Sequence, residues 1–348
     1  MLTIKKHVAE RLHDKYASLV TEPALSCDDF AGFLEYPPDD KLGDLAFPCF
    51  RLSKELRKAP PVIASTLAEG LSDEIIGEAT VAGGYLNIKI NPAYYAKLIP
   101  QILEKGEKYG SFDFGKGKTV VLDYSSPNVA KPFHIGHLGT TVIGHSLKML
   151  HEFAGYKCVG VNHLGDWGTQ FGKMIVAYKK WGDKEAVEKG QCDELVALYV
   201  KFHEEAEKHP ELEDEARHEF TKLEHHDEEN MKLWQWFIDI SLKEYQKTYD
   251  QLGITFDSYK GESFYYDKVP AVVEELREKG LLKMDDGAAI VDLEKYGMPP
   301  CLILKNDGSS IYPSRDIAAA EYRKKTYDFD KCIYVTSAGQ SLHFRQWF

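Results

Sequence analysis

The sequence predicts an α/β protein in which a small N-terminal α/β domain precedes a larger domain with an open parallel sheet. Three observations support this fold class. At about 150 residues per domain, the 348 residues are enough for two domains. A glycine-containing linker at 115–117 separates two patterns of secondary structure. The second pattern runs strand, helix, strand, an order typical of parallel sheets.

The first domain is predicted over residues 1–114. Apolar residues recur at helical spacing from Val8 to Val20, which indicates an amphipathic helix. The run at 85–90 has the composition of a strand. Asn91-Pro92 follows it, and because asparagine caps helices and proline fits the first helical position, we expect a helix through Ile102.

The second domain is predicted over residues 115–348. The run at 119–124 is continuously apolar, as in a parallel strand buried on both faces. We expect a helix to about Ala154 and a second strand at 157–165. Ligands of such sheets bind beyond the carboxyl ends of the strands, so the turn after each strand is a candidate site.

Negative charge is concentrated in one segment. The chain carries a net charge of -12, and between Asp183 and Glu229 there are 17 acidic residues against 6 lysines and arginines. Helix-forming residues dominate this segment, so we expect solvated helices within a helical and connective insertion at about 178–300. A generally basic protein that coats nucleic acid is disfavoured, and if the protein meets a polyanion, this surface should point away from it.

Other features limit the cellular setting. No stretch is long and apolar enough to span a membrane, and the charged N-terminal segment lacks the apolar core of a signal peptide. The six cysteines are far apart and include no C-x-x-C pair, which disfavours zinc sites and disulfide frameworks. We expect a cytoplasmic protein with reduced cysteines, no membrane partner and no dedicated metal site.

Polar groups gather in the turn after the first strand of the second domain. His134 and His137 are three residues apart at a predicted helix start, so their side chains lie on one face. Free N–H groups and the helix dipole favour phosphate there. Imidazoles can donate to phosphoryl oxygens, and Gly136 has no Cβ to hold a flat base away. Packing at a helix start would explain either histidine alone, but not the strand, turn, paired histidines and glycine together.

This turn resembles the HIGH signature of class I aminoacyl-tRNA synthetases, and the run 125–137 is similar to arginyl-tRNA synthetases in particular. The resemblance implies a Rossmann-like (HUP-type) catalytic domain with a helical insertion, and an N-terminal domain that touches the outer corner of the tRNA. It covers nearly the whole chain. Its further motifs lie at 41–46, 83–88, 162–172, 261–263, 312–316 and 340–344.

The resemblance implies that L-arginine attacks the α-phosphate of ATP to give arginyl-adenylate, and that tRNA(Arg) then accepts the arginyl group. Catalysis would be positioning and charge stabilisation, with Mg²⁺ bound through ATP. The expected catalytic residues are His134, His137 and Lys131, a lysine thought to compensate in family members without a standard second signature. The residues expected to bind ATP are His134, Gly136, His137, Gly165 and Asp166.

A selective pocket for a guanidinium needs carboxylates arranged as a fork, because the group is planar, always charged and presents five N–H donors. Asp316 is the first candidate. If a helix begins near Ser314, Asp316 and Tyr312 can face one cavity; Arg315 could instead neutralise Asp316. By resemblance, Glu262 is the second carboxylate. The positions that match those holding the substrate's ammonium and carboxylate groups are Asp123, Ser126, Asn128 and Gln340.

The chain departs from the family pattern where it stops, after Phe348. The second class I signature and the anticodon-binding domain would follow, so we expect a truncated, monomeric enzyme that is inactive alone. One alternative is a non-catalytic fragment that binds arginine or tRNA, which tRNA-dependent pyrophosphate exchange would distinguish. Another is a nucleotidyltransferase with a HIGH-type helix start, which would need no tRNA. The cysteinyl, glutamyl and glutaminyl synthetases share only the HIGH fragment.

Overall fold

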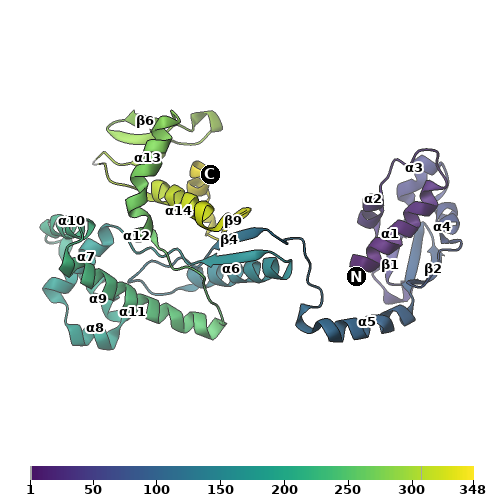
Figure 1. Ribbon diagram of the computed structural model, residues 1–348, viewed down its shortest axis with the longest axis horizontal. Coiled ribbons are helices and arrows are strands. Elements are labelled where there is room, and N and C mark those ends of the chain that lie inside the picture. Colours follow the sequence, from purple (N-terminus) through teal and green to yellow (C-terminus); the bar gives the residue numbers. More distant parts are fainter. Residues whose placement is uncertain (1, 307) are drawn as a thin grey trace. The chain divides into compact units, whose positions relative to one another are not determined.

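The computed structural model describes residues 2–306 and 308–348. The chain divides into two compact units, residues 1–110 and 111–348 (Figure 1). The predicted linker at 115–117 lies inside the second unit, where the N–H of Gly115 donates to the carbonyl oxygen of Ala154 at 3.0 Å. Among the described residues, no helix is both long and apolar enough to cross a membrane.

The first unit is a three-stranded antiparallel sheet, ordered β1-β3-β2, with helices packed against it. Its mainly aliphatic core includes an aromatic group: the rings of Phe30 and Phe47 stack with centroids 5.1 Å apart, and Tyr16 is fully buried beside them. The predicted strand at 85–90 is confirmed as β3. The bounds are α1 Leu2–Ala17, α2 Cys27–Phe33, β1 Leu45–Pro48, α3 Ser53–Leu56, α4 Pro60–Ala68, β2 Ile76–Ala82, β3 Tyr85–Ile90 and α5 Pro92–Lys105.

Asn91 caps α5 as predicted. Its side chain accepts a hydrogen bond from the N–H of Ala93 at 2.9 Å. The helix runs three residues beyond the predicted end at Ile102, because the residues after Ile102 favour helix and Gly106 is the first that stops it.

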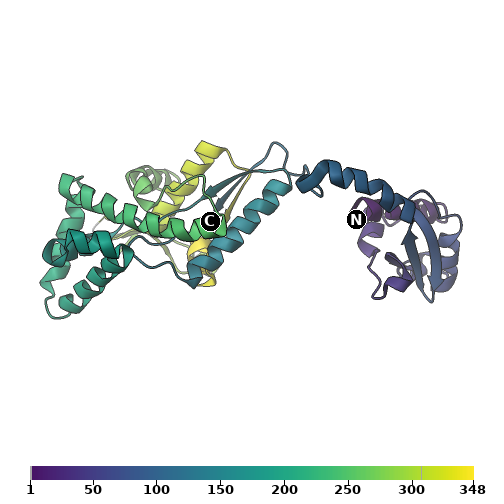
Figure 2. The ribbon, with the colours of Figure 1, turned by 90° about the horizontal axis from the view of Figure 1, so that it is seen from below.

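The second unit contains the predicted parallel sheet, ordered β5-β4-β9. The fold class is therefore confirmed as α/β with a small N-terminal domain. The central strand β4 is buried on both faces, and α6 and α14 cover opposite faces of the sheet (Figures 1 and 2). The bounds are β4 Thr119–Asp123, α6 Ile135–Phe153, β5 Lys157–Val161, α14 Tyr312–Tyr327, β9 Lys331–Tyr334 and α15 Ser341–Trp347.

The strand predicted at 157–165 ends early, at Val161. Beyond that residue the chain leaves the sheet, because the N–H of Asn162 donates to the carbonyl oxygen of Ser258 at 2.8 Å. The glycine-containing loop that follows is thus free to turn toward the loop after β4.

Between β5 and α14 the chain forms a group of helices and a small antiparallel sheet, ordered β6-β7-β8. The helices predicted between Asp183 and Glu229 are confirmed. The bounds are α7 Thr169–Trp181, α8 Lys184–Gly190, α9 Cys192–Ala206, α10 Glu211–Glu224, α11 Glu228–Leu252, α12 Glu262–Tyr265, α13 Val269–Glu278, β6 Leu282–Asp285, β7 Ala288–Val291 and β8 Cys301–Leu304.

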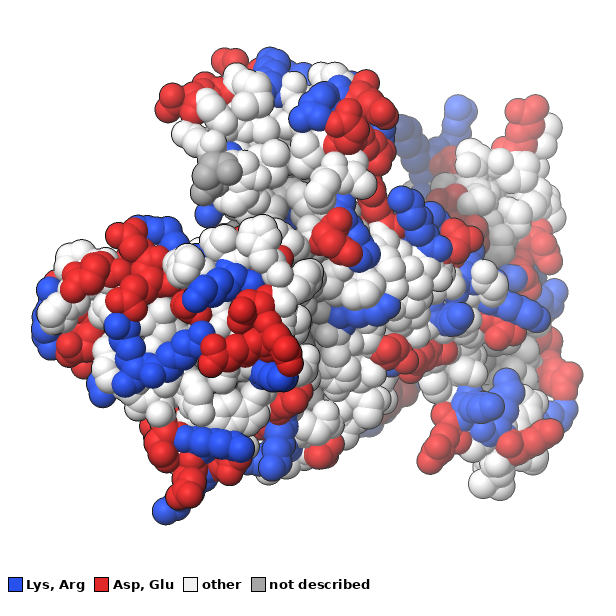
Figure 3. Space-filling view, turned by 60° about the vertical axis from the view of Figure 1, so that its left-hand side comes forward, with Lys and Arg blue, Asp and Glu red and all other residues white. Residues whose placement is uncertain are grey.

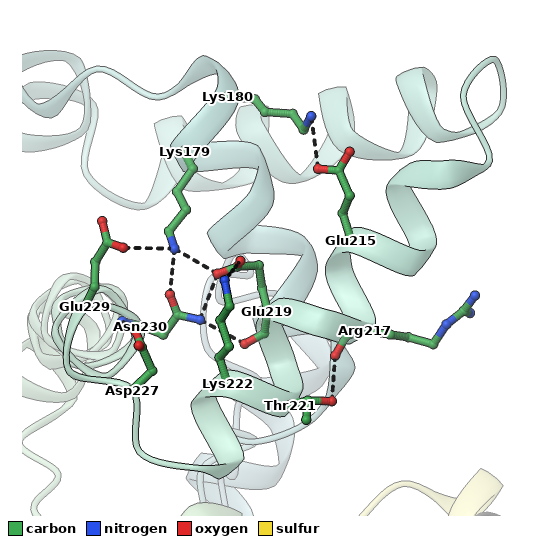
Figure 4. A network of polar contacts seen from close by, with 10 residues as sticks. All are labelled: Lys179, Lys180, Glu215, Arg217, Glu219, Thr221, Lys222, Asp227, Glu229 and Asn230. Carbon is green, nitrogen blue, oxygen red and sulfur yellow. Dashed lines mark hydrogen bonds and ion pairs between the residues drawn. The ribbon is translucent and has the colours of Figure 1, made fainter.

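The acidic charge of this region is interleaved with lysines on the face shown in Figure 3. Figure 4 shows the best-connected group. The ammonium of Lys179 lies 2.8 Å from a carboxylate oxygen of Glu219 and 3.2 Å from one of Glu229, and Asn230 donates to Glu219 at 2.9 Å. Burial acts to raise the pKa of Glu219, but hydrogen bonds from Lys179, Lys222 and Asn230 outweigh it and lower the pKa to about 2. The carboxylate thus ties α7, α10 and α11 together.

Candidate functional site

The loop after β4 has an unusual backbone. Ser125, Ser126 and Ala130 have positive φ values of 73°, 49° and 58°, which cost non-glycine residues on the order of 1 kcal/mol or more each. Hydrogen bonds from other elements hold this conformation. Asn162 accepts from the N–H of Ser126 at 3.1 Å, and Ser241 accepts from that of Ala130 at 2.9 Å.

Two tyrosines of α11 also hold this loop. The hydroxyl of Tyr245 lies 2.7 Å from the carbonyl oxygens of both Asn128 and Lys131, and the hydroxyl of Tyr249 lies 2.8 Å from that of Ser125. The sequence analysis did not single out these tyrosines, although their i,i+4 spacing places both on one side of a helix. The helical insertion therefore shapes the loop.

The two histidines organise the start of α6. Nδ1 of His134 accepts from the N–H of Gly136 at 3.1 Å, and Nδ1 of His137 accepts from the N–H of His134 at 3.4 Å. The rings stack with centroids 3.8 Å apart, so the predicted shared face is confirmed. A Cβ on Gly136 would lie 2.9 Å from the His134 ring, so a side chain at this position would displace the ring from its present place.

The hydrogen bonds at Nδ1 determine which ring nitrogen of each histidine is free to donate. Because both Nδ1 atoms accept, each neutral ring carries its proton on Nε2. Burial, with the charges of His134 and Lys131, lowers the pKa of His137 to about 4, so that ring is neutral at physiological pH. Among the described residues neither Nε2–H nor the ammonium of Lys131 has a partner. These three groups are free donors at a helix N-terminus, a setting that favours an anion.

The glycine-containing loop after β5 pairs with the loop after β4. The N–H of Val129 donates to Gly165 and the N–H of Gly165 donates to Pro127, each at 3.1 Å. The carboxylate of Asp166 is buried and accepts from the N–H and hydroxyl of Ser263 at 2.8 and 2.7 Å. Asp166, expected to bind ATP, is thus engaged with the residue that follows Glu262.

Asp123 is fully engaged by the protein. It is 7% exposed, and its Oδ2 lies 2.7 Å from Nη2 of Arg323, which is 1% exposed. Its Oδ1 accepts from the Ser126 hydroxyl at 2.8 Å. His163 lies 3.2 Å from the same Nη2. The sequence analysis missed Arg323, although its place seven residues after Asp316 puts both on one face of a helix.

The carboxylates expected to bind the guanidinium have partners too. Arg315 donates from Nη1 to Oε2 of Glu262 at 2.6 Å, so the alternative that Arg315 neutralises Asp316 is wrong. Asp316 instead lies 2.6 Å from Nε2 of His343. The helix begins at Tyr312, two residues before the predicted start. The Tyr312 side chain is 58% exposed and faces the Arg315 guanidinium.

Two other expected residues, Asn128 and Gln340, are exposed, and Gln340 directly precedes α15. A hollow of about 430 Å³ lies between α14, β9 and α15. It has an apolar lining that includes Cys332, Tyr334 and Trp347 and none of the residues expected to bind substrate. The site therefore combines paired carboxylates with free donors at the start of α6, around the carboxyl ends of β4 and β5.

Metal ligands are not grouped in this site. Among the residues that the structure describes, no cluster of three or more histidines, cysteines and acidic residues could hold a metal ion. The six cysteines are free thiols.

Comparisons with known proteins identify both units. Residues 98–348 match the model of the catalytic domain of class I tRNA synthetases (R), and residues 2–90 match the arginyl-tRNA synthetase N-terminal domain. The arginine–tRNA ligase of Clostridioides difficile is 58% identical over 328 residues, which are 93% of this chain and 58% of that protein. That of Clostridium perfringens is 52% identical over 345 residues, which are 99% and 60%.

Solved structures agree. The crystal structure of arginyl-tRNA synthetase from Plasmodium falciparum superposes with a TM-score of 0.73 at 26% identity, covering 99% of this chain and 61% of that one. The Thermus thermophilus arginyl-tRNA synthetase has the same fold, with a TM-score of 0.63 at 22% identity over 92% of this chain and 53% of that one. The chain thus spans about three fifths of the length of the curated relatives described above.

Proposed function

Because this chain belongs to the arginyl-tRNA synthetase family, we propose that it takes part in the ATP-dependent ligation of L-arginine to tRNA(Arg) through an arginyl-adenylate. The same proposal includes residues 1–114 as a domain that contacts tRNA, residues 115–348 as an incomplete catalytic domain with an insertion at about 178–300, and a monomeric chain in the cytoplasm. Because the chain spans only part of its relatives, we expect arginine binding without tRNA charging by the chain alone.

The proposed phosphate site is the start of α6. Its support is the set of free donors there: Nε2–H of His134, Nε2–H of His137 and the ammonium of Lys131. Neutral imidazoles suit this task, because the adenylation step moves charge between oxygens and needs no proton from them. Gly136 leaves the helix start open for ATP. We propose that Mg²⁺ is bound by the phosphates of ATP and not by a dedicated site on the protein.

Two residues of the glycine-containing loop have supporting parts in this proposal. Gly165 lets the loops after β4 and β5 pair closely, since a Cβ there would lie 2.1 Å from Oδ1 of Asn128. Asp166 acts on the arginine side, through Ser263, rather than on ATP directly. Gly165 would therefore shape the nucleotide site, and Asp166 the arginine site.

The proposed arginine site is the pair of carboxylates, Glu262 and Asp316, with the ring of Tyr312. The observation that carries this proposal is that each carboxylate is already paired with a cationic or imidazole side chain. Both carboxylates thus already lie against planar side chains of the chain that can donate N–H groups, which supports the proposal. Asn128 and Gln340, both exposed, would take the ammonium and carboxylate of arginine, whereas Asp123 and Ser126 would act by holding the loop.

The test is calorimetric binding of L-arginine to the 348-residue chain, with L-citrulline as the neutral control of the same shape. The two partly buried carboxylates should favour arginine by about 10²-fold or more, because citrulline brings no positive charge to them. Asp316→Asn should abolish that preference, and Lys283→Met, at an exposed ion pair far from the site in sequence, should leave it unchanged. Equal binding of both ligands would refute the pocket. Pyrophosphate exchange with and without tRNA then tests the adenylation step.

A further inference from the structure

The Arg315 guanidinium lies between two residues proposed to bind the guanidinium of the substrate. Its Nη1 donates to Oε2 of Glu262 at 2.6 Å, and its Cζ lies 5.1 Å from the ring centroid of Tyr312. The Arg315 and Glu262 side chains are only 9% and 13% exposed. This pair is therefore a buried part of the pocket and not a surface ion pair.

The backbone around Glu262 is fixed independently of Arg315. The N–H of Glu262 donates to the carbonyl oxygen of Leu164 at 3.0 Å, and Asp166 holds the next residue, Ser263, through two hydrogen bonds. A Cβ on the preceding residue, Gly261, would lie 2.5 Å from Asp166. The backbone contacts do not fix the direction of the Glu262 carboxylate. Arg315 pairs with this carboxylate and so determines its direction. Oε1 has no partner among the described residues.

The charges near Glu262 explain why it needs a cation. The pKa of Glu262 is raised to about 7: burial is the largest cause, the charges of Asp166 and Asp316 add to it, and Arg315 opposes it. Without Arg315, the carboxyl would be mostly protonated at neutral pH and would attract a guanidinium less strongly. The titratable and charged groups facing this cluster are Arg315 and Asp316 on α14, Asp166 and His163 beyond β5, and His343 on α15.

Building on the proposed function, we propose that Arg315 is a positioning residue of the arginine pocket. It turns Glu262, and favours its ionised form, so that the second carboxylate oxygen is free to accept from the substrate's guanidinium. Arg315 stays in place when arginine binds, and Glu262 then bridges two guanidinium groups, one from the protein and one from the substrate.

The experiment compares Arg315→Met with Arg315→Lys, and uses Arg277→Met as the matched control, because Arg277 pairs with Glu274 on the exposed side of α13. Calorimetry should give about tenfold weaker arginine binding for Arg315→Met, which corresponds to a change of about one pKa unit in Glu262. Arg315→Lys should recover part of the affinity, and Arg277→Met should match the parent chain. The deficit of Arg315→Met should grow as the pH falls from 9 to 7, which a purely structural defect would not do.

Unchanged arginine affinity in Arg315→Met would overturn the inference. Tighter binding would overturn it too, since Arg315 would then be a competitor that must leave the pocket. A second measurement does not depend on ligand: ¹³C NMR titration of Glu262, assigned through Glu262→Gln, should show a higher pKa in Arg315→Met by at least about one unit. If that shift occurs but the parent chain binds no arginine, the proposed pocket fails while the control of Glu262 by Arg315 stands; without the shift, the inference itself fails.

Discussion

The loop at 125–137 and the ion-paired side of the site are built in opposite ways. The loop is a run of consecutive residues, exposed at His134 and held through its backbone by hydrogen bonds from α11 and the β5 loop. The other side combines distant segments around Asp123, Glu262 and Asp316, and its carboxylates are held by side chains of α14 and α15.

In the loop, ligand binding and stability depend on different groups, whereas on the ion-paired side they depend on the same groups. Side chains of the loop can be replaced at little cost in unfolding free energy if the backbone stays unchanged, because hydrogen bonds to backbone groups hold the loop. On the ion-paired side, removing one partner leaves a buried charge uncompensated. Substitutions there should therefore lower the stability of the fold as well as the affinity for the ligand. Four measurements of unfolding free energy test this contrast.

The largest expected effect is at the buried pair of Arg323 and Asp123. Arg323→Met should lower the unfolding free energy by about 3–5 kcal/mol, because the Asp123 carboxylate would be left buried without its cation. Urea denaturation followed by tryptophan fluorescence measures this loss. Lys283→Met, which breaks an exposed ion pair with Asp292, serves as the control and should cost less than about 0.5 kcal/mol. Similar small losses for both would contradict the contrast.

The second effect is an acid-dependent loss of stability in the helical insertion. The pKa of Glu219 is lowered from its ordinary 4.5 to about 2 in the folded chain. Its stabilisation is therefore complete above its ordinary pKa and is lost as the pH falls from about 5 toward 2, up to about 3 kcal/mol. Glu219→Gln should flatten the pH dependence of unfolding in that window. Glu228→Gln, at an exposed pair with Lys232, should not.

The third effect concerns the contact between α11 of the helical insertion and the loop at 125–137. Tyr245→Phe removes the hydroxyl that contacts the carbonyl oxygens of Asn128 and Lys131, and should cost about 1–2 kcal/mol. Amide hydrogen exchange in the loop should also become faster, because the loop loses its tie to α11. Tyr199→Phe is the matched control, since the Tyr199 hydroxyl has no hydrogen-bond partner among the described residues. Equal exchange in both variants would show that the loop holds itself.

The smallest effect on stability is expected at His134, the N-cap of α6. Asparagine is a favourable N-cap residue, so His134→Asn should change the unfolding free energy by less than about 0.5 kcal/mol. It should nevertheless weaken ATP binding by about tenfold, because the Nε2–H donor is lost. The stability is read from urea denaturation and the affinity from calorimetry. A loss of unfolding free energy larger than about 1 kcal/mol would contradict this and show that His134 supports the fold as the buried ion pairs do.

The contrast also explains which parts of the molecule could be predicted from sequence. The fold class, the central strand, α6 and the stacked histidines follow from periodicity and from spacing within one short segment. The strand after α6 was predicted four residues too long, because its end depends on Ser258, far away in sequence. The pairing of Arg315 with Glu262 rather than Asp316 depends on how α14 packs against α12. Arg323 was marked only by its helical spacing from Asp316, because a buried ion pair between distant segments leaves no sequence motif.

The parallel pairing of β4 with β9 has a consequence for the order of events during synthesis. The N–H of Thr119 donates to Asp330, 211 positions later, at 2.7 Å. At 5–20 residues per second, β4 and Asp123 wait roughly 10–40 seconds after they are made before β9 and Arg323 exist. During that time one edge of the central strand is unpaired, and such an edge can pair with other chains. The nascent polypeptide therefore passes through a stage in which a chaperone would protect this buried central strand from pairing with other chains.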